Sequence, residues 1–252
     1  MFAQQCNEDI SYEKILAPEE GFVEAATRFL AQPDAIGCNV TMPFKLDAYY
    51  LAQVDDQAAK DAKAVNTLMN HEDGTIKGFN TDGVGLVNDL LNNGVALKNK
   101  RVLLIGAGGA ARGVISPLLE AGVASLIMTN RTIARAEQVA NETNHTRLSV
   151  VSLDNIASVK PHVIINSTAA SLHNELPCHM DAKVLEDCEV VYDMVYKNSP
   201  TLFMREAKAR GVNQCLDGLG MLVEQAASAF QIWTGKTPRT QTVVSELRAI
   251  VS

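Results

Sequence analysis

The second half of the chain alternates between short, mainly apolar runs and longer stretches in which apolar residues recur at helical spacing. The runs, which are typical of parallel strands buried on both faces, lie at 102–105, 125–129, 148–150, 163–165 and 190–192. Helical spacing follows at 114–119, from 135 to 141 and at 202–210. Strands that alternate with helices in this way predict an α/β fold, with a parallel sheet covered on both faces.

Strands and helices are also predicted in the first 92 residues, and further helices in the last 40. We expect strands at 11–16, 36–41, 64–69 and 75–79, and helices at 22–30, 46–54, 58–64, 84–92, 222–233 and 241–251. Residues 1–5 have the pattern of the end of a helix. Asp73-Gly74 is a strong turn signal, so the strands on either side of it should form a hairpin.

The strongest local motif is a glycine turn after the run 102–105. It reads Gly106-Ala107-Gly108-Gly109-Ala110, with Ala111 where a small residue allows the next helix to pack against the strand. The free N–H groups at the start of that helix would bind the phosphates of a dinucleotide. A single motif of this kind is weak, because small residues also make tight turns that bind nothing.

The end of the next strand indicates which dinucleotide is preferred. Sites for NAD usually have an acidic residue there, which binds the ribose hydroxyls. This chain has Asn130-Arg131-Thr132 instead, and Arg135 one helical turn later. Because these residues offer hydrogen-bond donors and positive charge to a 2′-phosphate, the sequence favours NADP over NAD. The alternative is that Arg131 and Arg135 are solvated residues of a surface helix.

Composition excludes some classes of protein. In 252 residues, 47% are hydrophobic, 20% are charged and the formal net charge is −7, which argues against a nucleic-acid surface. There is no apolar stretch of membrane length and no secretion signal near the start, so we expect a cytoplasmic protein. The five cysteines and five histidines are scattered without metal-ligand spacing, so we expect reduced thiols and no metal.

Three polar clusters stand at the ends of predicted elements, where open α/β sheets place their sites. Each has an ordinary alternative, because Asn, Thr and Asp often cap helices and a lysine can be solvated. Gln225 is a polar residue on a mainly apolar helix face, so it should find either an internal partner or a ligand. The clusters are Asn39 with Thr41 and Lys45, Asn66 with Thr67, and Asn80 with Thr81 and Asp82.

Six motifs together resemble the shikimate dehydrogenase family, in the same order and over almost the whole chain. The resemblance implies reversible, NADPH-dependent reduction of 3-dehydroshikimate to shikimate in the pathway to chorismate and the aromatic amino acids. The motifs are Asn39-Val40-Thr41-Met42-Pro43-Phe44-Lys45, Ala64-Val65-Asn66-Thr67, Asn80-Thr81-Asp82-Gly83, Gly106-Ala107-Gly108-Gly109-Ala110, Asn130-Arg131-Thr132 and Asp217-Gly218-Leu219-Gly220-Met221-Leu222.

The resemblance also implies two domains with the active site in the cleft between them. Residues 1–81, completed by 218–252, would form an α/β substrate domain, and 82–217 a doubly wound, Rossmann-type NADP domain. Lys45 and Asp82 would be the catalytic pair. The family's substrate contacts would fall on Thr41, Asn66, Gln225 and Asn39, and its cofactor contacts on Gly106, Gly108, Gly109, Ala110, Asn130, Arg131, Thr132, Arg135, Met194, Tyr196 and Gly218.

The sequence differs from the family pattern in two places. The family opens with a strand and a loop of two serines that bind the substrate carboxylate, and this chain begins after them, so we expect poor stability and little shikimate oxidation. After Asn166-Ser167-Thr168 the family usually has a glycine, where this chain has Ala169-Ala170-Ser171. The alternatives are a quinate/shikimate dehydrogenase that uses NAD or NADP, and a truncated, catalytically impaired NADP-binding protein. The chain could be a monomer or a homodimer.

Overall fold

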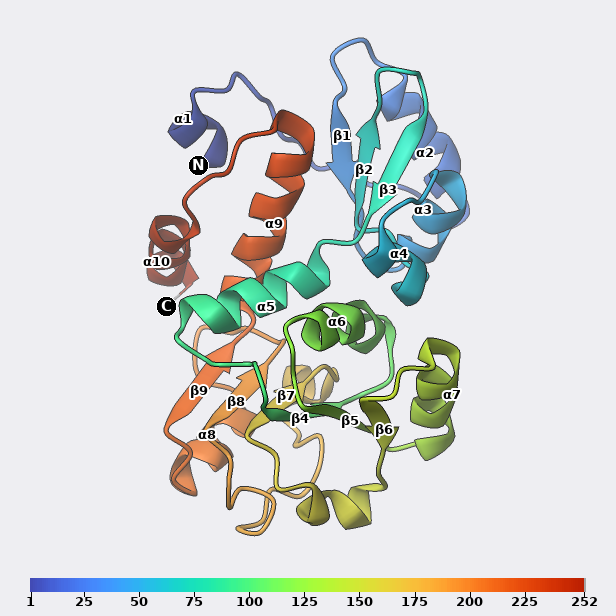
Figure 1. Ribbon diagram of the computed structural model, residues 1–252. Coiled ribbons are helices and arrows are strands. Elements are labelled where there is room, and N and C mark those ends of the chain that lie inside the picture. The colour runs from blue at the N-terminus through green and yellow to red at the C-terminus, as the bar shows by residue number, and fades with distance from the viewer. Residues whose placement is uncertain (252) are drawn as a thin grey trace.

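The computed structural model describes residues 1–251, which form two lobes, each with its own sheet (Figure 1). The smaller lobe has a three-stranded antiparallel sheet in the order β1-β2-β3. A hydrophobic cluster joins this sheet to the helices that cover it. The elements are β1 (Gly37–Asn39), β2 (Thr67–Asn70), β3 (Ile76–Phe79), α2 (Phe22–Leu30), α3 (Lys45–Leu51) and α4 (Gln57–Ala62).

The larger lobe has a six-stranded sheet, in the order β6-β5-β4-β7-β8-β9, and every neighbouring pair is parallel. The chain runs outwards from β4 to β6 and then returns to β7. The carboxyl ends of β4 and β7 therefore form the switch point at which such sheets bind ligands. The elements are β4 (Arg101–Ile105), β5 (Ser125–Thr129), β6 (Leu148–Val150), β7 (Val163–Asn166), β8 (Val190–Asp193), β9 (Gln214–Asp217), α6 (Gly109–Glu120), α7 (Ile133–Thr143), α8 (Leu202–Ala209) and the 3₁₀ helices η1 (Leu153–Val159) and η2 (Ala170–His173).

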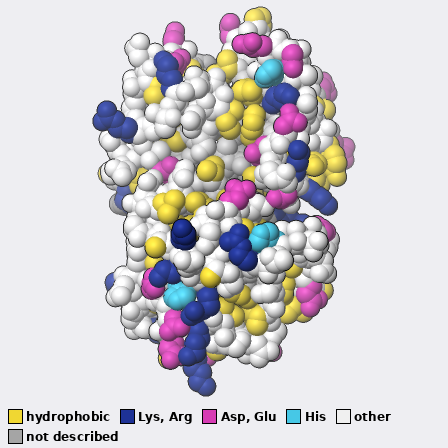
Figure 2. Space-filling model, in the orientation of Figure 1, with side chains coloured by type: hydrophobic (Ala, Val, Ile, Leu, Met, Phe, Trp, Pro, Cys, Tyr) yellow, Lys and Arg dark blue, Asp and Glu magenta, His cyan; other side chains and the backbone are white. Residues whose placement is uncertain are grey.

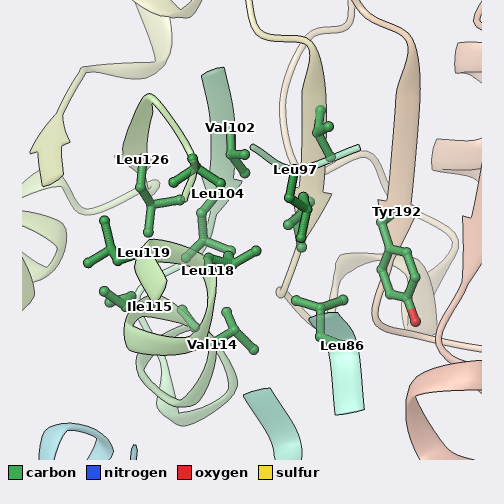
Figure 3. Packing of buried hydrophobic residues seen from close by; sticks show 14 of the residues in the cluster. Leu86, Leu97, Val102, Leu104, Val114, Ile115, Leu118, Leu119, Leu126 and Tyr192 are labelled. Carbon is green, nitrogen blue, oxygen red and sulfur yellow. The ribbon is translucent and has the colours of Figure 1, made fainter. Parts of the chain in front are cut away.

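The core explains why β4 is an unbroken apolar run. Val102 and Leu104 point to one face of the sheet, where they pack with Leu118 of α6 and its neighbours (Figure 3). Leu103 and Ile105 point to the other face, where they join a second cluster that includes Phe203 of α8. Because side chains alternate along a strand, a strand with helices on both faces needs apolar residues at every position.

Two helices join the lobes and lie against each other. Helix α5 (Asp82–Asn92) leads from the smaller lobe to the larger one, and α9 (Leu219–Thr234) returns. Close packing depends on glycine: a Cβ on Gly83 would lie 2.2 Å from the Gly113 carbonyl oxygen of α6, and one on Gly85 would lie 2.8 Å from the Gln225 nitrogen of α9. Helices that touch through their backbones have little freedom to shift.

The returning chain then packs against the smaller lobe. The Trp233 indole donates a hydrogen bond of 2.9 Å to the Leu68 carbonyl of β2. The ring of Phe2, in α1 (Phe2–Cys6), lies 6.0 Å from that of Phe230. The last helix, α10 (Thr240–Val251), lies beside α9. Within residues 1–251 no helix is long and apolar enough to cross a bilayer.

One expectation about the elements was wrong, and three elements were missed. The predicted strand 11–16 has no regular structure, and Leu16 is 97% exposed. In the described part of the chain no backbone hydrogen bond joins this segment to a strand, and a strand without a ladder partner leaves its N–H and C=O groups to water. The short, mixed strand β9 was missed, and so were the 3₁₀ helices.

We predict that Gly83→Ala lowers the free energy of unfolding by roughly 1–3 kcal/mol, because the added methyl group pushes against backbone that cannot move aside. Gly113→Ala is the matched control, since its Cβ would lie 3.6 Å from Asn80, an ordinary contact distance. Alanine also favours a helix over glycine by about 1 kcal/mol. Urea unfolding followed by Trp233 fluorescence measures the stability of both variants. Equal unfolding midpoints for Gly83→Ala and Gly113→Ala would contradict the close packing of α5 and α6.

Candidate active site

A lysine and an aspartate from distant parts of the sequence meet where the lobes join. Lys45 opens α3 and Asp82 opens α5, and the Lys45 Nζ lies 2.6 Å from the Asp82 Oδ2. The two side chains are 28% and 16% exposed. The pair is therefore partly shielded from water, which strengthens a charge-assisted hydrogen bond, and it still has an open side for a ligand.

Asn66, a residue that is 3% exposed, contacts Asp82 through its side-chain amide. Its Oδ1 accepts the Thr81 backbone N–H at 2.9 Å, and a backbone N–H can only donate. The Nδ2 must therefore be the atom on the other side of the amide, where it donates to the Asp82 Oδ1 at 2.9 Å. Each carboxylate oxygen of Asp82 thus accepts one bond, from Asn66 and from Lys45.

The other predicted substrate residues surround this pair in different ways. Gln225 of α9 is half-buried, and its Oε1 lies 3.4 Å from both the Asn66 Nδ2 and the Thr81 hydroxyl. Thr41 is exposed four residues before Lys45. The amide of Asn39 is already used within the protein: its Oδ1 accepts the Tyr12 hydroxyl at 2.7 Å, and its Nδ2 donates to Asn66 and Thr67.

The glycine turn of the larger lobe fits a phosphate group. Gly106 has φ of +120°, and a Cβ there would lie 2.3 Å from the Ser167 hydroxyl, so only glycine is suitable. A Cβ on Gly108 or Gly109 would meet nothing within 4 Å, and these residues and Ala110 are exposed at the start of α6. Open space beside unpaired helix N–H groups is what a pyrophosphate needs.

The predicted 2′-phosphate residues lie next to this turn. Strand β5 pairs with β4 so that Thr129 lies opposite Ile105, which places Asn130 beside Gly106. The Asn130 side chain donates to the Thr132 carbonyl at 2.9 Å and holds the start of α7. Arg131, Thr132 and Arg135 are all exposed there, so their donors are available to a ligand.

At the other end of the sheet, Gly218 and Met194 lie in direct contact. A Cβ on Gly218 would lie 2.1 Å from the Met194 carbonyl oxygen, so this approach again depends on glycine. Tyr196 is 41% exposed in the same loop. All the predicted cofactor residues therefore follow strands of one parallel sheet and lie at its carboxyl edge. They are the glycine turn, the predicted 2′-phosphate residues and the residues of this loop.

One organising residue of this edge was missed from the sequence. Asp193 is fully buried at the end of β8, and its carboxylate accepts hydrogen bonds from Asn166, Ser171, Val195 and Thr201. Burial raises the pKa of Asp193, and the four donors oppose that rise. It thereby joins the loop after β7 to the loop after β8. An acidic residue directly after a buried apolar strand was the signal that could have revealed it.

Two surface features offer no chemistry comparable to that of the Lys45–Asp82 pair. A groove of about 890 Å³ at the lobe junction is lined by α4, α5, α6 and α9 and does not include Lys45, Asp82 or Asn66. On the face of Figure 2, acidic and basic side chains are mixed over both lobes. Among residues 1–251 no group of three or more histidine, cysteine, aspartate or glutamate side chains could hold a metal ion.

A close lysine–aspartate pair, in a molecule whose parallel sheet offers an opening for pyrophosphate, is typical of a two-domain, dinucleotide-dependent dehydrogenase. Comparison with known proteins narrows this class, and the chain belongs to the shikimate dehydrogenase family. Family models match residues 1–68 (shikimate dehydrogenase substrate binding domain), 88–186 (shikimate / quinate 5-dehydrogenase) and 218–248 (shikimate 5'-dehydrogenase C-terminal domain).

Individual relatives cover almost the whole chain. A shikimate dehydrogenase (NADP(+)) from Alteromonas mediterranea is 68% identical over 251 residues, which are 100% of this chain and 90% of that protein. The crystal structure of an Ael1 enzyme from Pseudomonas putida is 39% identical, with a TM-score of 0.91 over 98% of this chain and 90% of that one. Shikimate 5-dehydrogenase from Thermus thermophilus, in complex with NADP(H) and shikimate, is 31% identical, with a TM-score of 0.85 and coverage of 100% and 92%.

We predict that Asp193 makes the protein less stable as the pH rises from 3.8, the ordinary pKa of an aspartate, to the raised pKa that Asp193 has in the folded protein. In that interval the folded state binds more protons than the unfolded state, so stability falls with pH. Asp193→Asn, which cannot ionise, should remove this part of the pH dependence in urea unfolding. Asp34→Asn, which removes an exposed carboxylate, is the control. If Asp193→Asn instead makes stability fall more steeply with pH, the donors outweigh burial.

Proposed function

We propose that this chain catalyses the reversible, NADPH-dependent reduction of 3-dehydroshikimate to shikimate, a step in aromatic amino-acid biosynthesis. The Lys45–Asp82 pair, held at the lobe junction by Asn66, is the observation that carries this proposal. The relatives support it, since those from Alteromonas mediterranea and Thioalkalivibrio sulfidiphilus are named as shikimate dehydrogenases (NADP(+)).

In this mechanism Lys45 manages the charge and the proton of the reacting oxygen. NADPH, when bound, supplies the hydride to the carbonyl carbon. The carbonyl oxygen becomes an alkoxide, which the Lys45 ammonium stabilises and protonates. The Asp82 carboxylate accepts a hydrogen bond of 2.6 Å from the Lys45 ammonium, and it can accept another from a substrate hydroxyl. In the reverse direction, the neutral Lys45 amine that this step leaves receives the hydroxyl proton.

The remaining residues divide between substrate and cofactor. We assign Thr41, Gln225, Asn66 and Asn39 to the substrate hydroxyls. The amides of Asn66 and Asn39 also make hydrogen bonds within the protein. The cofactor residues are Gly106, Gly108, Gly109 and Ala110 for the pyrophosphate, Asn130, Arg131, Thr132 and Arg135 for the 2′-phosphate end, and Met194, Tyr196 and Gly218 for the nicotinamide end.

The proposed domains follow the two sheets. We assign residues 1–81 and 218–252 to the substrate domain, with residue 252 outside the described part, and 82–217 to the NADP domain. The contacts of Trp233 with Leu68 and of Phe230 with Phe2 support the return of the chain to the first domain. We also propose a cytoplasmic location, since five free cysteines suit a reducing compartment. We propose that the chain is a monomer or a homodimer.

The comparisons give the alternatives no better support. A quinate/shikimate dehydrogenase that accepts NAD would suit an acidic residue after β5, where this chain has Asn130 and Arg131. A truncated, impaired NADP-binding protein would have no need of a paired ammonium and carboxylate.

The test is the appearance of NADPH absorbance on mixing the chain with shikimate and NADP⁺. Faster reaction with quinate and NAD⁺ would favour the first alternative, and cofactor binding without turnover the second.

We predict that Arg131→Ala weakens binding of NADPH by roughly 10- to 100-fold and leaves NADH nearly unchanged. The lost contact is a charge-assisted hydrogen bond to a phosphate that only NADPH carries. Fluorescence titration of both cofactors measures the effect. Arg210→Ala, which removes another exposed arginine at the end of α8, is the control. An equal loss of affinity for NADPH and NADH would contradict the assignment of Arg131 to the 2′-phosphate.

We predict that Lys45→Met lowers kcat for shikimate oxidation on the order of 100-fold or more and changes KM much less. The charge that Lys45 stabilises exists mainly in the transition state, so its loss affects turnover rather than binding. Lys77→Met, which removes a lysine paired with Asp55 elsewhere on the smaller lobe, is the control. If only KM rises, Lys45 binds the substrate and does not take part in the chemistry.

A further inference from the structure

Thr67 is a buried polar residue beside the proposed active site. It is the first residue of β2 and is 0% exposed, so its side chain cannot touch a substrate. Its hydroxyl lies between two site amides, donating to the Asn66 Oδ1 at 2.9 Å and accepting from the Asn39 Nδ2 at 3.2 Å. Burying a hydroxyl costs free energy unless it is hydrogen-bonded, and valine would fill the same place in a strand without that cost.

The direction of each hydrogen bond is fixed from both ends. The Thr81 backbone N–H identifies the Asn66 oxygen, which has no hydrogen of its own, so Thr67 must donate to it. On the other side, the Asn66 backbone carbonyl can only accept, so it identifies the Nδ2 of Asn39. That Nδ2 also donates to the lone pair left on the Thr67 oxygen.

The result is a continuous line of donors that ends on the catalytic carboxylate. It runs from Asn39 to Thr67, from Thr67 to Asn66, and from Asn66 to Asp82. Asp82 in turn holds Lys45. A change in the Asn66 amide would therefore reach the ammonium group through a single residue.

We propose that Thr67 is a positioning residue for the reaction: its hydroxyl holds the Asn66 amide so that Nδ2 donates to Asp82, and Asp82 in turn aligns Lys45 with the substrate. The proposal rests on the function given above. The Thr81 backbone N–H provides a second hold on Asn66. Loss of the Thr67 hydroxyl should make the Asn66 amide more mobile without reversing its orientation. We therefore expect only a partial loss of activity.

Two substitutions separate positioning from packing. Thr67→Val keeps the shape and removes the hydroxyl, whereas Thr67→Ser keeps the hydroxyl and leaves a cavity of one methyl group. We expect Thr67→Val to lower kcat/KM for shikimate roughly tenfold, with the KM for NADP⁺ unchanged. Thr67→Ser should remain within about threefold of the unsubstituted chain, even where it melts at a lower temperature.

A purely structural role predicts the reverse order, with Thr67→Ser worse than Thr67→Val because it removes buried apolar contact. That order, or full activity of Thr67→Val, overturns the proposal. Activity of the unsubstituted chain is the reference for both variants, so the effect of Thr67 is always read against a measured rate.

A second measurement does not depend on turnover. The Asn66 side-chain amide can be followed by ¹⁵N NMR of the full chain, with its signals assigned from their loss in Asn66→Asp. Thr67→Val should shift or broaden these signals, and Thr67→Ser should restore them. If the unsubstituted chain does not oxidise shikimate and these shifts occur, the proposed function fails while the hold of Thr67 on Asn66 stands. Unchanged Asn66 signals in Thr67→Val overturn the positioning role whatever the activity.

Discussion

The hydrogen bond from the Asn66 amide to Asp82 is the contact on which the proposed site depends. Asn66 is buried, and a buried amide must satisfy both its oxygen and its nitrogen or lose stability. The Thr81 backbone N–H takes the oxygen, so the nitrogen is left for the carboxylate. Because Thr81 and Asp82 are consecutive, one side chain fixes both the end of the hairpin and the start of α5. Lys45 then has a carboxylate in a defined place to bind.

Glycine packing extends that local order to the whole molecule. Helix α5 carries Asp82 at its first position, and its next residues include Gly83 and Gly85, which bring it into backbone contact with α6 and α9. Helix α6 begins at the glycine turn of the larger lobe, and α9 begins directly after Gly218. Asp82 and the carboxyl edge of the parallel sheet are therefore joined through rigid elements. A small error in this packing would separate the two halves of the site.

The larger lobe could be predicted from the sequence, because strands such as β4 are buried on both faces and each is followed by turn residues or a helix. The strand expected at 11–16 failed because local pattern does not show whether a ladder partner is present, and β9 was missed because Gln214 and Asp217 interrupt its apolar character. Motifs located Lys45, Asn66 and Asp82, and the resemblance to a family gave them roles. They could not show that the Asn39 amide is occupied by Tyr12. Such pairings depend on how distant segments pack.

A crystal structure of the chain with shikimate and NADP⁺ tests the central claim most directly. The account predicts that the reacting hydroxyl of shikimate lies within hydrogen-bond distance of the Lys45 Nζ, about 3 Å, with Asn66 still donating to Asp82 and the cofactor phosphates on the N–H groups of Gly108 and Gly109. Shikimate bound elsewhere, for example in the groove lined by α4, α5, α6 and α9 and away from Lys45, would contradict it.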